Sequence, residues 1–295
     1  MVRRRTFSLL NPVLAGLLLA VLLVAPSQDL AAAAGDMLLE APFPGLAPEG
    51  ITLDLSDGSF WVTSFLDGVI RHFDAELQPL GSIPSPFLPS ESATGIAYRP
   101  ANDTLLVVEP ITHELLEIDK TGNPTGFGLF LPILPVVNPL GSPVLRGMAF
   151  HPQGGGGIGS VYVVETVGSL IYEIDLLGEV VRTFEHPDDP DGYPGSGAGA
   201  PAGGIELILD AGGGLLGIDL VGAEGGFPVV RRLDGGSGPT GLSIPLAATG
   251  AADVGGIARA LYVDPQDGSL FDALYGTSEA SAELFVVDGE LPPLA

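Results

Sequence analysis

The sequence contains no cysteine, and its 295 residues include 4 histidines, 1 tryptophan and 11 lysine or arginine residues. Without cysteine the chain cannot form disulfides, thiolate zinc sites or iron–sulfur clusters, and it cannot use a thiolate nucleophile. The histidines (His72, His113, His151 and His186) lack the close spacing of a zinc site. The 36 acidic residues give a formal net charge of −25, so we expect no nucleic-acid partner and no stable association with anionic membranes.

The N-terminus has the order of a secretory signal peptide. The segment Met1-Val-Arg-Arg-Arg is cationic, residues 13–24 are an apolar run, and residues 31–35 read Ala-Ala-Ala-Ala-Gly. We predict a signal over 1–34, cleavage near Ala34 and one domain over 35–295. An uncleaved N-terminal anchor is the alternative. The arginine-rich signal is typical of bacteria, so we expect export to the periplasm or the medium.

Glycine and proline are abundant, at 43 and 27 residues, and 46% of the chain is hydrophobic. This mixture indicates many short strands joined by tight turns, since both residues oppose long helices. The sequence also repeats. Five units begin at recurring anchor glycines: Gly50, Gly95, Gly147, Gly204 and Gly256. Such a period of about 40–50 residues is typical of four-stranded propeller blades.

Each unit predicts three apolar strands and a fourth, proline-containing strand such as 80–84. The third strand ends at a recurring aspartate: Asp74, Asp119, Asp175, Asp234 or Asp288. The last unit has no fourth strand, and the segment 37–44 before the first unit resembles one. We therefore predict a closed all-β propeller of five blades, in which the N-terminal strand completes the last blade. A sixth blade would have to lie in 122–145 or 185–203, inserts too short for four strands.

The unit from Gly95-Ile-Ala-Tyr-Arg-Pro to Leu-Leu-Glu-Ile-Asp119 and the unit after Gly147-Met-Ala-Phe-His-Pro resemble blades of the NHL-repeat and gluconolactonase-like (senescence-marker-protein-like) β-propeller superfamily. The gluconolactonase branch implies a divalent metal, such as Ca²⁺, in the central channel, held by a glutamate before the first glycine, an asparagine and an aspartate. Glu49 matches the glutamate. The corresponding later residues are Thr94, Arg146, Gly203 and Gly255, so the expected asparagine is replaced.

Several polar residues are expected to converge at one mouth of the channel, because they begin inner strands or end second strands. These candidates are Glu49, Thr63, Glu109, Arg146, Glu165 and Asp219. Glu49, Glu109 and Glu165 are the candidate metal ligands, and Glu49 and Arg146 the candidate catalytic residues. The acidic run 188–192 lacks the ligand spacing of a calcium loop and is interpreted as a turn.

These residues form no complete catalytic set. The leading hypothesis is therefore an exported module, expected to be monomeric, that binds a small molecule or a protein. The alternatives are a metal-assisted hydrolase of the lactonase or esterase kind and a structural scaffold. The fold alone does not choose between them.

Overall fold

The structure is a computed structural model that describes residues 33–87, 93–133, 144–165, 170–187, 203–224, 227–249, 254–278 and 281–290. The predicted signal up to residue 32 and the acidic run 188–192 lie outside this part of the chain. Residues 33–295 belong to one compact unit. None of the described helices is long and apolar enough to cross a membrane.

The unit is a five-bladed β-propeller of four-stranded antiparallel sheets. The first blade contains β2 (Pro48–Asp54), β3 (Ser59–Ser64), β4 (Val69–Phe73) and β5 (Pro79–Pro84). The second contains β6 (Gly95–Arg99), β7 (Thr104–Val108), β8 (Glu114–Ile118) and β9 (Pro124–Phe130). The third contains β10 (Leu145–His151), β11 (Ser160–Glu165), β12 (Leu170–Asp175) and β13 (Val180–Glu185), with the short α2 (Gly154–Gly157) in its first turn.

The fourth blade contains β14 (Ile205–Leu209), β15 (Leu215–Glu224), β16 (Phe227–Asp234) and β17 (Pro239–Pro245), followed by η1 (Ala247–Thr249). The fifth contains β18 (Ile257–Val263), β19 (Leu270–Ser278), β20 (Glu283–Asp288) and the N-terminal β1 (Met37–Pro42). Strand β9 is the outer strand of blade 2, so the part of the 122–145 insert that is described belongs to a predicted blade. The five-blade prediction is confirmed.

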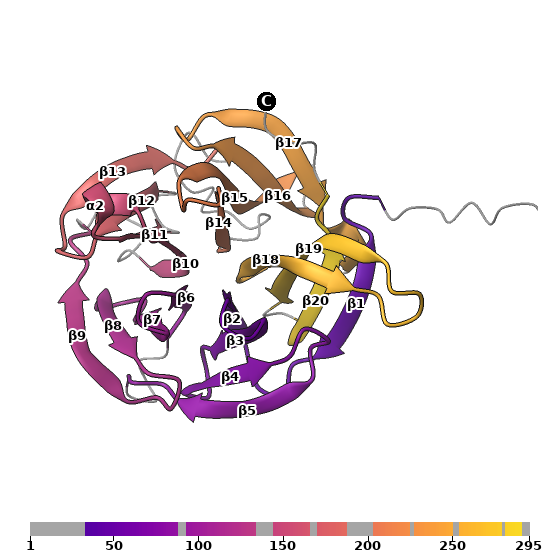
Figure 1. Ribbon diagram of the computed structural model, residues 1–295, viewed down its shortest axis with the longest axis horizontal. Helices are drawn as coiled ribbons and strands as arrows, with labels where there is room; N and C mark the ends of the chain where they lie inside the picture. Colours follow the sequence, from indigo (N-terminus) through magenta and orange to yellow (C-terminus); the bar gives the residue numbers. More distant parts are fainter. Residues whose placement is uncertain are drawn as a thin grey trace, which may run out of the picture. The chain divides into compact units, whose positions relative to one another are not determined.

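The N-terminal strand closes the ring, as predicted. β1 pairs antiparallel with β20, so the first and last segments of the unit share one sheet. Figure 1 shows β2, β6, β10, β14 and β18 nearest the axis, and β1 with the outer strands β5, β9, β13 and β17 at the rim. Inner strands of successive blades contact each other, and β18 returns to β2.

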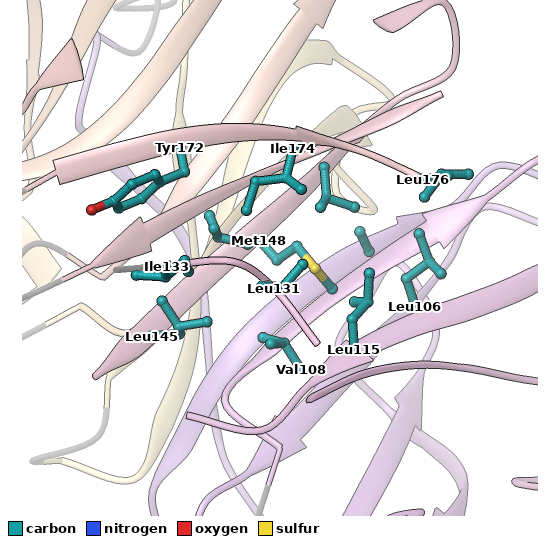
Figure 2. Close-up of a cluster of buried hydrophobic side chains, with 13 residues drawn as sticks. Leu106, Val108, Leu115, Leu131, Ile133, Leu145, Met148, Tyr172, Ile174 and Leu176 are labelled. Atoms are coloured by element: carbon teal, nitrogen blue, oxygen red, sulfur yellow. The ribbon is translucent and has the colours of Figure 1, made fainter. Parts of the chain in front are cut away.

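Five hydrophobic clusters hold the blades together, one between each pair of neighbours. Strand β7 shows why second strands are almost wholly apolar. Leu105 and Val107 pack toward blade 1, whereas Leu106 and Val108 pack toward blade 3. The cluster between blades 2 and 3 includes Met148 and Ile174 and is shown in Figure 2. Successive side chains of a strand point to opposite faces, so a strand covered on both sides needs apolar residues throughout.

The recurring anchor glycine and the recurring aspartate each have a geometric cause. A Cβ on Gly256 would lie 2.5 Å from the carbonyl oxygen of Glu49, so close inner strands require glycine there. The recurring aspartate caps the turn after the third strand. In blade 2, Asp119 Oδ1 accepts the N–H groups of Thr121 at 2.8 Å and Asn123 at 3.0 Å. The Thr121 hydroxyl also donates to Asp119 Oδ1 at 2.6 Å, and this bond, followed by those from the backbone, lowers the Asp119 pKa to about 2.

Candidate functional site: an axial cavity and its charged wall

The structure brings two of the predicted residues together at the start of the inner strands. Glu49 is the second residue of β2 and is buried, while Arg146 is the second residue of β10. Arg146 Nη2 lies 3.5 Å from Glu49 Oε1, which links blade 1 to blade 3 across the axis. The carboxylate that matches the metal-ligand position of the gluconolactonase-like pattern is thus engaged by a guanidinium.

Glu109 organises its own turn. It follows β7, and its Oε2 accepts the Ile111 N–H at 2.7 Å and the Thr112 hydroxyl at 2.7 Å, together with the Thr112 N–H. Glu165 is the last residue of β11 and is equally buried. Burial and then the charge of Glu165 raise the pKa of Tyr172.

Thr63 joins two blades through the backbone. Its hydroxyl accepts the Gly50 N–H at 2.9 Å and lies 3.3 Å from the Thr94 carbonyl oxygen of blade 2, to which it donates. Thr277 repeats this arrangement at the ring closure: it accepts the Gly256 N–H at 2.8 Å and donates to the Glu49 carbonyl oxygen at 2.6 Å. Thr63 is a predicted channel residue, whereas its counterpart Thr277 is not predicted from the sequence.

Asp219 does not end its strand as predicted. Strand β15 continues to Glu224, and Asp219 pairs in register with Glu206 of β14, well inside the sheet. Asp219 is therefore not the structural counterpart of Glu109. In blade 2, Val108 pairs with the anchor glycine Gly95; in blade 4, Val221 bonds to the equivalent Gly204. Val221 is thus the counterpart of Val108, and Asp219 lies two residues before it, farther inside the sheet. Its position inside the sheet separates Asp219 from Glu49, Glu109 and Glu165.

Asp219 instead centres a buried charged cluster. Its carboxylate accepts two hydrogen bonds from Arg232, at 2.8 and 2.9 Å, and one from Arg259 of blade 5, at 2.9 Å. Arg259 also binds Asp272 at 2.6 Å. Paired, charge-assisted bonds of this kind compensate the cost of burying ions and fix the planes of both guanidiniums.

A cavity of about 240 Å³ opens beside this cluster. All five inner strands line it, through Thr52, Tyr98, Phe150, Glu206 and Arg259 among others, which places it on the axis. Its walls include residues at the ends of inner strands, such as Leu209 at the end of β14. Glu49 and Arg146 stand at the starts of their strands, so the cavity and the predicted channel mouth occupy opposite ends of the inner strands.

Glu206 is the residue of the cavity with the most altered acidity. Burial and then the negative charge of Asp219 raise its pKa to about 8, against the opposing charge and backbone N–H of Arg259. The sequence did contain a signal for this residue. Glu206 stands between the buried Ile205 and Leu207 in an inner strand, where an acid is unexpected.

Two of the predicted metal ligands, Glu49 and Glu109, bind other groups of the protein. Among the described residues, no group of three or more histidines or acids is close enough to hold a metal. Glu49 is paired with Arg146, and Glu109 binds its own turn. The described histidines have other contacts: His72 stacks on Trp61, and His151 contacts the Gly213 carbonyl oxygen at 3.1 Å.

No protein-family model matches the sequence, and no curated protein matches it. Solved propellers are similar in fold. Virginiamycin B lyase from Staphylococcus aureus is 21% identical, with 84% of this chain and 68% of that chain covered and a TM-score of 0.42. The β-propeller domain of Cps50 (Swd1) from Myceliophteria thermophila is 9% identical, with 84% and 98% covered and a TM-score of 0.45. These similarities concern the β-propeller fold.

Proposed function

We propose that this chain is an exported binding module that holds a small ligand in its axial cavity. The carrying observation is a cavity of about 240 Å³ lined by all five inner strands, with Glu206 and Arg259 set among apolar residues. Ligand sites are typically concave and mostly apolar, with a few polar groups that orient the ligand. The volume suits one ring with a short side chain, since a cavity of about 150 Å³ accepts benzene.

The surroundings of the other candidate residues favour binding over metal-assisted hydrolysis. A catalytic carboxylate must be available to a metal, a water or the substrate. Glu49 is held by Arg146, and Glu109 by the backbone of its own turn. We place the chain among the NHL-like propellers as a divergent member whose channel no longer carries the metal-binding pattern.

A blocked-cavity variant tests the proposal. Leu209 lines the cavity, whereas Leu216, also in blade 4, is 49% exposed and serves as the control position. A small-molecule library is screened by thermal shift. A ligand that binds only the folded state at 100 times its dissociation constant adds about 2.7 kcal/mol. That stabilisation should vanish in Leu209→Trp and persist in Leu216→Trp. A ligand that stabilises both variants equally binds elsewhere and contradicts the proposal.

Export is tested separately. The chain is produced in a bacterial host, and the protein from the periplasm and the medium is sequenced from its N-terminus. We expect mature protein that begins near Gly35, because residues 31–35 provide the small side chains of a cleavage site. Protein that remains in the cytoplasm with Met1 retained would contradict export.

A further inference from the structure

The cavity adjoins a cluster of charged side chains in which both guanidiniums are already bonded to aspartates. Three carboxylates, of Glu206, Asp219 and Asp272, accompany two guanidiniums, of Arg232 and Arg259. Both guanidiniums are bonded to the aspartates: Arg232 to Asp219, and Arg259 to Asp219 and Asp272. Glu206 lies opposite Asp219 in the β14–β15 pair, where two like charges repel each other.

A proton on Glu206 removes its repulsion with Asp219 when the cavity holds no cation. With its pKa raised to about 8, roughly nine-tenths of this carboxyl is protonated at pH 7. A positive charge placed beside Glu206 would offset the repulsion from Asp219 and release the proton. A ligand in the cavity can supply this positive charge, because Glu206 is one of the residues that line the cavity.

The rest of the wall is suited to an apolar body. Leu53, Ala149 and Leu207 line the cavity, and Tyr98 and Phe150 add two aromatic side chains. Aromatic faces attract cations and pack against rings, so they accept an organic cation better than a hydrated metal ion. The chain's net charge of −25 also attracts cations toward the molecule and repels anions.

We infer that the axial cavity binds a small organic cation, an ammonium group on an apolar body, and that this ammonium pairs with the Glu206 carboxylate. The inference rests on the proposed ligand-binding function and names its ligand class. In the binding step, the protonated Glu206 gives its proton to solvent, the carboxylate forms, and the ammonium keeps its own protons. Arg259 stays bonded to Asp219 and Asp272.

Three probes of one shape separate the possible ligand charges. Phenethylamine is cationic, phenethyl alcohol neutral and phenylacetate anionic at pH 7. Isothermal titration in two buffers of different ionisation enthalpy yields both the affinity and the number of protons released. We expect the amine to bind at least tenfold more tightly than the other two, with release of about one proton at pH 7. As pH rises toward 8, the dissociation constant of the amine should fall about tenfold for each pH unit. Above pH 8 it should level off.

The Glu206→Gln variant identifies the residue. Glutamine replaces a carboxyl that is mostly neutral at pH 7, so the fold should tolerate it. We expect amine affinity to fall at least tenfold and proton release to disappear, with alcohol binding unchanged. Glu114→Gln, on the third strand β8, is the matched control and should bind the amine like the parent.

The outcomes distinguish this inference from the proposed function. The alcohol or phenylacetate could bind as tightly as the amine, with that binding abolished by Leu209→Trp. This result would overturn the preference for a cation but leave the cavity as a ligand site. Amine binding without proton release, or unaffected by Glu206→Gln, also overturns the inference. If neither the probes nor the library yields a ligand sensitive to Leu209→Trp, the proposed function itself fails.

Discussion

Asp219 and Arg259 form an ion pair that crosses from blade 4 to blade 5, with Asp219 Oδ2 lying 2.9 Å from Arg259 Nη2. The same carboxylate holds Arg232 through two hydrogen bonds. It also faces Glu206 across the β14–β15 pair, and after burial its negative charge is the next cause of the raised pKa of that residue. Asp219 therefore contacts Arg259 directly and adds to the effect of burial on Glu206, the other charged residue of the cavity.

The first prediction concerns Asp219→Asn. Asp219 is fully buried, and its removal leaves two guanidiniums without their shared counter-ion. We expect a loss of about 3 kcal/mol in the free energy of unfolding, measured by urea denaturation at pH 7. Asp272→Asn is the control, because that side chain is 49% exposed and should cost less than about 1 kcal/mol. Equal effects of the two changes would contradict the central role of Asp219.

The second prediction concerns the pH dependence of stability. The pKa of Glu206 is about 8 in the fold and rises from an ordinary value of 4.5. Between these values the unfolded chain ionises while the folded chain keeps its proton, so this residue makes the protein less stable as pH rises from 5 to 8. Each unit of difference between the folded and unfolded pKa changes the free energy of unfolding by about 1.4 kcal/mol.

Glu206→Gln removes that dependence. We expect the variant to lose roughly 3 to 4 kcal/mol less than the parent between pH 5 and pH 8, measured by urea denaturation at both values. Above pH 8 the two curves should run parallel. Parallel curves over the whole interval would mean that the Glu206 pKa is ordinary in the fold.

The blade pattern was predictable because its markers are produced by local geometry. Gly256 recurs where a Cβ would meet the neighbouring backbone, and Asp119 recurs where a turn needs an acceptor for its N–H groups. Closure was predictable for a related reason. The last unit lacked an outer strand, and β1 had a suitable sequence before the first unit.

The charged wall of the cavity was not predictable by the same means. Arg259 meets Asp219 from 40 residues away, on another blade. Strand alternation marks Glu206 as unusual but does not show which residues face it. The misplacement of Asp219 arose because an acid near the end of one strand was equated with an acid inside another. Sheet register, which depends on pairing between strands, is needed to tell them apart.

The third prediction tests the link between the last and first blades. Thr277 is buried, accepts the Gly256 N–H and donates to the Glu49 carbonyl oxygen. Thr277→Val keeps the shape and removes both hydrogen bonds, so we expect a loss of about 2 kcal/mol. Thr277→Ser keeps the hydroxyl and should retain most of that stability. If serine loses stability and valine does not, packing of the methyl group rather than the hydroxyl matters here.

The last prediction concerns ring closure by the N-terminal strand. Phe43 follows β1, is 5% exposed and packs 6.0 Å from Phe73, between the centroids of the two rings, in the cluster joining blades 5 and 1. Phe43→Ala should cost about 3 kcal/mol. Leu46→Ala, at a neighbouring position that is 59% exposed, should stay within about 0.5 kcal/mol of the parent.

Fluorescence of Trp61, the single tryptophan of the chain, reports on blade 1, while circular dichroism reports on all blades. If β1 closes a cooperative ring, Phe43→Ala should shift both transitions to the same lower urea concentration. The reason is that detachment of β1 from blade 5 also uncovers the neighbouring face of blade 1, so the blades unfold together. A shift in only one of the two signals would show that the blades unfold independently of this closure.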